Sequence, residues 1–274
     1  MTIEPFCPDD IAPFMRLAVS ENWVVETWEL EFLLSEFSTG CLVARGEQVE
    51  TVGFISSLRH ERSGWIGNLI VAAEQRGRGI GESLFVSSLN ALRSAGVETV
   101  WLTASKSGRS LYEKHGFTQI DTINRWVGTG GQRDGAHEVA AGYAGVTAIM
   151  RDIDGQAWGD VREALLRVTA GRGVVQRNES GFLTQQPCGA AVQFGPFSAT
   201  NDRSAERLFD DASVNIASGT KILLDAPESN RAAELLYTRK KMRIAGSNCL
   251  MYAGVKPEYR PELIYGLATM GSCG

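Results

Sequence analysis

The chain has 274 residues, of which 43% are hydrophobic and 22% charged, a composition typical of an ordinary soluble globular protein. At roughly 150 residues per domain, this length predicts two domains. The net charge of −5 at pH 7 argues against general binding to nucleic acid or to an anionic membrane, because both require a basic face.

The N-terminal residues show no secretory signal, and no uncharged apolar stretch approaches the roughly 18 residues of a membrane span. The five cysteines are scattered without a CxxC pair, and the three histidines share no metal-ligand spacing. This pattern predicts neither a disulfide framework nor a metal site and is typical of a reducing compartment. We therefore expect a cytoplasmic protein with no metal, no membrane partner and no nucleic-acid partner.

The first half has the pattern of a mixed α/β domain, in the order β-α-α-β-β-β-α-β-α-β. Strands are predicted at residues 2–7, 41–45, 51–59, 65–72, 99–103 and 118–127. Helices are predicted near residues 11–18, 27–40, 80–96 and 108–115.

Residues 128–145 are rich in glycine and poor in large apolar side chains, which predicts a linker between domains 1–127 and 146–274. In the second domain, strands are predicted at residues 146–151, 173–177, 181–186, 190–199, 221–226 and 244–255. Helices are predicted at 159–168, 201–216 and 230–240, and a tail at 256–274.

The two halves share a local sequence match as well as an order of elements. The segment that begins at Tyr112 aligns with the segment that begins at Tyr237, a displacement of 237 − 112 = 125 residues, and the same displacement relates Ser105 to Asn230. Together these matches favour an internal duplication.

A glycine-rich turn lies between the predicted strand 65–72 and the helix that follows it. Gly77, Gly79 and Gly81 allow a sharp turn and a close backbone approach to a ligand. The helix start supplies unpaired N–H groups and a positive dipole end, and Arg76 and Arg78 supply charge, which together predict an anion site.

Two common nucleotide motifs do not fit this turn. A P-loop would need Lys followed by Ser or Thr, and a dinucleotide fingerprint would need glycine where Glu82 stands.

The segment Gln75–Gly81 resembles the (Q/R)xxGx(G/A) signature of the GNAT acyltransferases, and Leu69–Val71 is similar to that family's acetyl-CoA-binding strand. Residues 105–117 resemble its second motif, although Ser105 replaces the usual Asn and Gly108 the usual Ala. The resemblance covers residues 2–127, and the whole chain resembles bacterial tandem-GNAT proteins with a degenerate C-terminal copy.

This resemblance implies a mixed α/β fold with two tandem GNAT-like domains and acetyl-CoA as the acyl donor. It implies that Tyr112 protonates the departing thiolate, and that a strand amide, at Val71 above all, stabilises the oxyanion. The implied cofactor-binding residues are Leu69, Ile70, Val71, Arg76, Gly77, Arg78, Gly79, Ile80, Gly81, Glu82 and Ser105. Arg109 and His115 are interpreted as surface groups.

The general base is left open by the sequence. The candidates are Glu26, Glu29, His60, Glu61 and, as a group that orients water or substrate, Asn68.

In the second half, the loop 198–205 contains no glycine, and Asp202 would repel a phosphate. We therefore expect this half to bind no CoA, and to cover the first domain's sheet or shape its acceptor pocket.

The sequence thus predicts an N-acetyltransferase that acts by direct attack of a primary amine in a ternary complex. The acceptor is a small-molecule amine or a protein amine, and the protein is a monomer or homodimer. The alternative is a CoA-sensing or interaction module that keeps the cofactor loop without turnover.

Overall fold

The computed structural model describes residues 1–47, 50–131, 145–214 and 216–274. The strands of the first half are β1 (Thr2–Pro5), β2 (Leu42–Arg45), β3 (Thr51–Arg59), β4 (Ser63–Val71), β5 (Thr99–Ala104) and β6 (Thr118–Thr129). Its helices are α1 (Ile11–Ser20), α2 (Thr27–Phe37), α3 (Ile80–Ser94) and α4 (Arg109–Lys114), with 3-10 turns η1 (Pro8–Asp10), η2 (Ser38–Gly40) and η3 (Ala73–Gln75). The predicted mixed α/β class and the predicted order of elements are confirmed.

Helix α3 shows how the apolar spacing sets these elements. Its buried residues Ile80, Leu84, Ser88 and Leu92 recur every four positions, so that they lie along one face of the helix. That face packs against β3 and β4. Beyond its C-terminal end, Gly96 adopts a φ of 81°, the left-handed conformation that commonly ends a helix.

The second half contains strands β7 (Val174–Asn178), β8 (Gly181–Cys188), β9 (Ala191–Ala199), β10 (Lys221–Pro227), β11 (Arg243–Gly254) and β12 (Ile264–Gly266). Its helices are α5 (Ala148–Trp158), α6 (Glu163–Arg172), α7 (Asp202–Ser213) and α8 (Arg231–Arg239), with one 3-10 turn, η4 (Pro261–Leu263).

The prediction of a strand at 146–151 is wrong, because residues 148–151 form the start of α5 and Thr147 is its N-cap. The apolar run Ala148-Ile149-Met150 resembles a short buried strand, but Met150, Ile153, Ala157 and Trp158 are buried at helical spacing. The next helix begins at Glu163 rather than at the predicted residue 159, because Gly159 ends α5 with a φ of 69°.

The predicted tail 256–274 contains structured and buried residues. It contains η4 and β12, and residues 263–269 are all buried. Its apolar side chains belong to the cores of both halves: Tyr265 packs in the second half, and Ala268 and Cys273 pack against α1 and α2 of the first.

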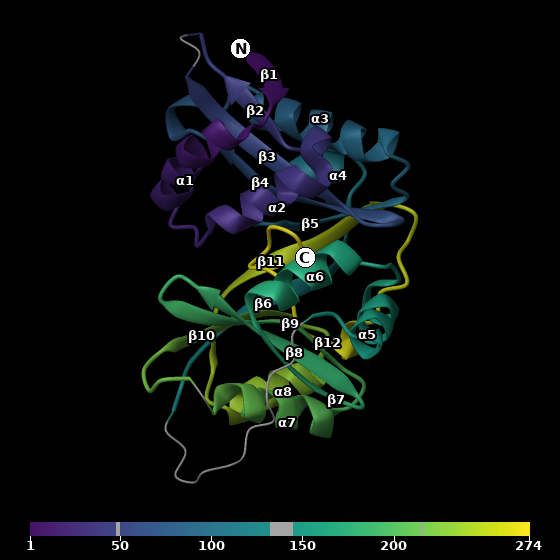
Figure 1. The fold of residues 1–274 in the computed structure, drawn as a ribbon. Coiled ribbons are helices and arrows are strands. Elements are labelled where there is room, and N and C mark those ends of the chain that lie inside the picture. The colour runs from purple at the N-terminus through teal and green to yellow at the C-terminus, as the bar shows by residue number, and fades with distance from the viewer. Residues whose placement is uncertain (48–49, 132–144, 215) are drawn as a thin grey trace.

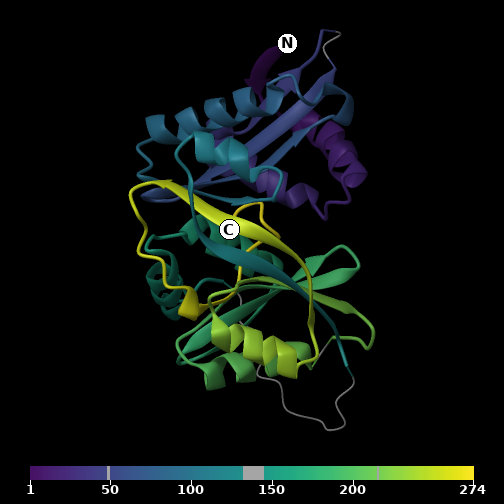
Figure 2. The same cartoon turned by 180° about the vertical axis from the view of Figure 1, so that it is seen from behind.

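All twelve strands form one sheet, with the order β1-β2-β3-β4-β5-β11-β6-β10-β9-β8-β7 and with β12 beside β9. The final long strand, β11, is antiparallel to β5 and to β6, and β6 is antiparallel to β10. Each half therefore supplies the strand that continues the other half's sheet. In Figures 1 and 2, β11 crosses the middle of the molecule between the two halves.

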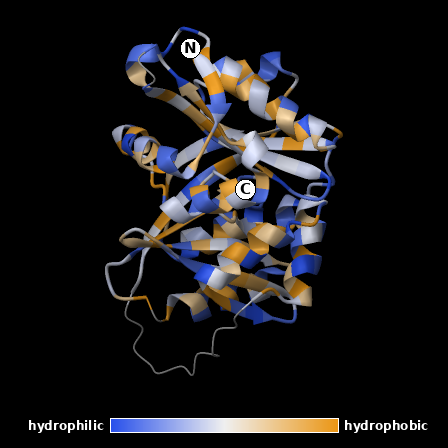
Figure 3. Cartoon of the chain, turned by 45° about the horizontal axis from the view of Figure 1, so that its top comes forward, coloured by the Kyte–Doolittle hydropathy of each residue, from blue (hydrophilic) through white to orange (hydrophobic). Residues whose placement is uncertain are grey.

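Helices cover both faces of this sheet (Figures 1 and 2). In the first half, α1 and α2 share one core, and α3 and α4 share another on the opposite face. In the second half, α7 and α8 pack against the core that contains Phe194 and Tyr265. The helices carry hydrophobic and hydrophilic residues on different sides (Figure 3), as expected of helices that each bury one face.

Strand β6 extends to Thr129, two residues beyond the predicted first-domain boundary, and most of the predicted linker, residues 132–144, lies outside the described residues. Within the described ranges no helix is long and apolar enough to cross a membrane. The same residues contain no cluster of His, Cys, Asp and Glu that could hold a metal ion.

Candidate active site

The glycine turn leads from β4 and η3 into α3. Gly77 and Gly79 have φ angles of 76° and 79°, and a Cβ atom at either position would meet nothing within 4 Å. Their conformation therefore favours glycine, and the space beside them is open. The first helical hydrogen bond runs from Ser83 N to Gly79 O, at 3.0 Å, so the N–H groups of residues 80–82 have no partner within the helix. This geometry can hold an anion.

The charged side chains around this turn contact protein groups. Arg76 donates from Nε to the carbonyl oxygen of Val71, at 2.9 Å, and pairs with Glu21. Arg78 donates to Gln75 Oε1 at 3.0 Å. The carboxylate of Glu82 lies 3.0 Å from His115 Nε2. A phosphate contact by either arginine stays a prediction, and for Arg76 it would compete with Glu21.

Strand β4 separates from β5 near the point where the resemblance to the GNAT family places the acyl thioester. Its parallel pairing with β5 runs from Ser63 to Ile66, and its register with β3 shifts by one residue between Ile70 and Gly67. Asn68 lies in this bulge with a φ of 56°. Bulges of this kind redirect backbone groups beside active sites.

The N–H group of Val71 faces away from β3. Ala72 donates to Val52 O at 2.8 Å, and alternate residues of an antiparallel strand face opposite neighbours. Ile70 is buried toward α1 and α2, and its backbone faces Phe54 of β3, so a ligand contact by Ile70 at this edge is not expected.

A cavity of about 270 Å³ opens beside this part of β4. It is lined by residues of β4 and β5, by Ser105 and Tyr112, by the loop after α1 and by Glu29 of α2. The structure therefore brings Leu69, Ser105 and Tyr112 of the predicted set to one cavity, with the glycine turn at the end of the same strand. The predicted roles of these residues stay predictions.

Tyr112 is buried to 9% exposure in α4, and its ring centroid lies 5.0 Å from that of Phe85. Burial raises the pKa of its hydroxyl to about 12, which keeps the phenol protonated at neutral pH. Ser105 accepts a hydrogen bond from Gly108 N at 3.2 Å, so its hydroxyl also stabilises the turn that starts α4.

Glu29 reaches the cavity from α2 with only 8% exposure. Burial, with a smaller contribution from the nearby Glu26, raises the pKa of its carboxyl to about 7 against the opposing effects of Ser272 and Arg172. The Ser272 hydroxyl donates a hydrogen bond to this carboxylate. A carboxyl with a pKa near 7 is suited to accept a proton at neutral pH.

Of the other candidates for the base, Asn68 alone lines this cavity in the described part of the chain, and its amide donates to Ser56 Oγ at 3.0 Å. Glu26 pairs with Arg172 at 3.0 Å and accepts from Gly189 N at 2.8 Å. Burial and the Arg162 charge lower the pKa of His60 to about 3, and Glu61 is exposed.

Part of the cavity wall comes from the second half and from β6, and no local pattern in the sequence predicts it. Arg125 and Asn248 line it from the two exchanged strands, and residues 270–272 line it from the C-terminal segment. Arg125 is held by Asp225, at 2.9 and 2.8 Å, and donates to Met270 O at 3.0 Å. The displacement of 125 residues shows that β6 and β11 are equivalent, but not that they are exchanged.

Comparisons with known proteins agree with this geometry. Two family models, each described as "Acetyltransferase (GNAT) domain", match residues 38–119 and 150–266. The structure is similar to that of a proposed acetyltransferase from Pyrococcus horikoshii, with 25% identity and a TM-score of 0.86 over 100% of this chain and 95% of that one.

Two further structures share the fold at lower identity. A GCN5-related N-acetyltransferase from Sphaerobacter thermophilus has 16% identity and a TM-score of 0.64, over 98% of each chain. One from Kribbella flavida has 16% identity and a TM-score of 0.58, over 92% of this chain and 70% of that one. No curated protein matches the chain.

Proposed function

We propose, from the premise that the chain belongs to the GNAT acetyltransferase family and carries two such domains in tandem, that its first half transfers an acetyl group from acetyl-CoA to a primary amine. The observation that carries this proposal is the cavity itself. The cavity is lined by the part of β4 that no longer pairs with β5, by the protonated Tyr112 and by the buried carboxylate of Glu29. Such a site offers one group to accept a proton and another to donate one.

The donor would lie along β4 and the glycine turn. Beyond Ile66 the β5-facing edge of β4 pairs with no strand in the described residues, so an extended pantetheine arm can bind there as an added strand. The unpaired N–H groups at the start of α3 would hold the pyrophosphate.

The acceptor would enter from the side of Glu29. An ammonium group binds favourably beside this buried carboxylate, which takes one proton and leaves a neutral amine. The amine then attacks the thioester carbonyl carbon, and the N–H of Val71 stabilises the resulting oxyanion. Collapse of the intermediate forms the amide and breaks the C–S bond. Tyr112 gives its proton to the departing thiolate, and the nitrogen releases its second proton, which restores the Tyr112 hydroxyl.

The test is turnover of acetyl-CoA with a panel of primary amines that includes small amines, amino acids and peptides, with the acetylated product identified by mass spectrometry. We expect an acetylated amine and free CoA in equal amounts. Binding of CoA without turnover of any acceptor would favour the sensing or interaction module instead. Failure to bind CoA would exclude both functions.

A further inference from the structure

The two halves differ in what lies between their diverging parallel strands. In the first half, β4 and β5 separate after the pair Ile66 and Leu102, and the cavity opens there. In the second half, β9 and β10 separate after the pair Gln193 and Leu223. The chain's own residues 264–267 occupy this second groove.

Main-chain hydrogen bonding holds this segment on both sides of the groove. Strand β12 is antiparallel to β9, with Ile264 opposite Ser198, and Leu267 N donates to Asp225 O in β10 at 2.8 Å. The contact is close, because a Cβ on Gly195 would lie 1.8 Å from Leu267 O. The segment therefore fills the place that the pantetheine arm would take beside β4 in the first half.

The residues equivalent to Tyr112 and Ser105 bind this segment. Tyr237 donates its hydroxyl to the carbonyl oxygen of Tyr265. Asn230 donates to the carbonyl oxygens of Ile264, at 2.8 Å, and Glu262, at 3.4 Å. Both side chains are buried, at 0% and 1% exposure. In the second half, the two positions of the duplicated motif thus hold polypeptide.

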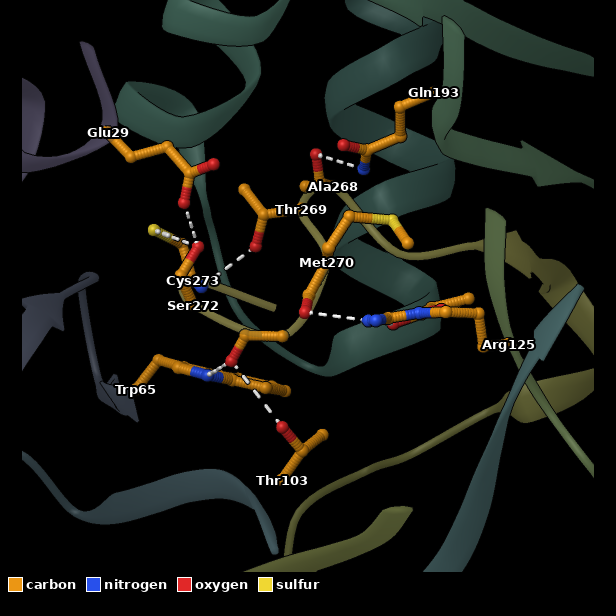
Figure 4. A network of polar contacts seen from close by, with 12 residues as sticks. Glu29, Trp65, Thr103, Arg125, Gln193, Ala268, Thr269, Met270, Ser272 and Cys273 are labelled. Carbon is orange, nitrogen blue, oxygen red and sulfur yellow. Dashed lines mark hydrogen bonds and ion pairs between the residues drawn. The ribbon is translucent and has the colours of Figure 1, made fainter. Parts of the chain in front are cut away.

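From this groove the segment continues into the wall of the first half's cavity (Figure 4). Gly271 O accepts from Trp65 Nε1 at 3.2 Å and from Thr103 Oγ1 at 3.4 Å. Ser272 donates to Glu29, and a Cβ on Gly67 would lie 2.2 Å from Ser272 O. The segment thus connects the second half's groove directly to the buried carboxylate.

We propose that the second half anchors this C-terminal segment, which occupies the groove between β9 and β10 in place of a cofactor. This anchoring positions Ser272 against Glu29 and so shapes the amine-binding pocket. Asn230, Tyr237 and Ser272 are then positioning residues. The role in the pocket rests on the proposed function, whereas the anchoring does not.

The test compares two helix-capping asparagines. Asn230 caps α8 by accepting from Ala233 N at 3.0 Å, and Asn201 caps α7 by accepting from Ser204 N at 2.9 Å. Aspartate keeps a cap of this kind. Asn230→Asp also replaces the donor to Ile264 O and Glu262 O with an oxygen that repels them, whereas Asn201→Asp changes only the cap.

The first readout is labelling of Cys273 by a thiol reagent, followed by mass spectrometry. Cys273 is a free thiol at 0% exposure, as is Cys41 at 1%. Asn230→Asp should speed labelling of Cys273 about tenfold, as the release of buried hydrogen bonds favours local opening. Asn201→Asp should match the wild type at both sites.

The second readout is steady-state kinetics. Asn230→Asp should raise KM for the amine about tenfold. It should also shift the pH below which kcat/KM falls as Glu29 becomes protonated, and it should leave the Kd of acetyl-CoA unchanged. Unchanged labelling of Cys273 in a folded Asn230→Asp protein would overturn the anchoring. Faster labelling with an unchanged amine KM and pH profile would overturn the role in the pocket. If the wild type acetylates no amine, the proposed function and that role fail together, and the labelling still decides the anchoring.

Discussion

Ile123 of β6 lies directly opposite Asn248 of β11. The two residues occupy equivalent positions in the two halves, since 248 − 123 = 125. The neighbouring pairs are reciprocal: Asn124 faces Ser247 and Thr122 faces Cys249, at 247 − 122 = 125 and 249 − 124 = 125. A local pseudo-twofold axis therefore passes through the pair of Ile123 and Asn248. The arrangement is that of a strand-exchanged dimer contained in one chain.

This exchange predicts that neither half folds alone. A fragment of residues 1–131 lacks β11, and so exposes an edge of β5 and leaves β6 without its partners; long exposed edges promote aggregation. We expect this fragment to aggregate or dimerise, and to become soluble and bind CoA when expressed together with residues 145–274. Size-exclusion chromatography measures this, and a monomeric fragment that binds CoA by itself would contradict it.

Local patterns predicted most of the elements. Helix α3, for example, buries one regularly spaced face, and β5 is a short apolar run that is buried at nearly every position. Glycine spacing also predicted the sharp turn before α3. In the structure, Gly77 and Gly79 of this turn have left-handed conformations. The neighbours of β11 and the course of the C-terminal segment could not be predicted, because they depend on contacts between distant residues. Ser272 and Glu29, for example, are separated by 243 positions. Such a pair leaves no periodic signal in a single sequence.

The filled groove of the second half predicts one CoA per chain. Gly79→Glu should abolish binding, because it places a carboxylate at the pyrophosphate site and strains a position with a φ of 79°. Ser204 lies in the first turn of α7, the helix of the second half that corresponds to α3, and Ser204→Glu should leave binding unchanged. Isothermal titration calorimetry with CoA gives both stoichiometry and Kd. A stoichiometry of two, or a loss of binding in Ser204→Glu, would contradict the prediction.

Removal of the Tyr112 hydroxyl should slow the chemical step. Tyr112→Phe keeps the ring packing on Phe85 and Phe117 but removes the proton donor to the thiolate. We expect kcat to fall about 100-fold, with the Kd of acetyl-CoA unchanged. Stopped-flow measurement of free CoA checks this. A kcat equal to that of the wild type would mean that Tyr112 only packs against the sheet.

The buried carboxyl of Glu29 should make stability depend on pH. Its pKa is raised from 4.5 to about 7, so between these values the native state keeps a proton that the unfolded state has lost. Stability then falls as pH rises from 4.5 to 7, by about 3 kcal/mol, and stays level above pH 7. Glu29→Gln should remove this loss, and exposed Glu61→Gln should not. Urea unfolding at pH 5 and pH 8 measures both variants, and a Glu29→Gln protein with the pH dependence of the wild type would refute the assignment.

The same ionisation should govern the rate if Glu29 accepts the proton of the amine. Below pH 7 the carboxyl is protonated and cannot act as a base, so kcat/KM should fall about tenfold per pH unit. Glu29→Gln should lower kcat/KM about 100-fold at pH 8 and remove this acidic limb. His60→Gln is the matched buried control, because a group whose pKa is about 3 does not titrate in this range, and its pH profile should keep the wild-type shape. The measurement is kcat/KM from pH 5 to pH 9 with a single amine. If the acidic limb persists in Glu29→Gln, the proton passes to another group.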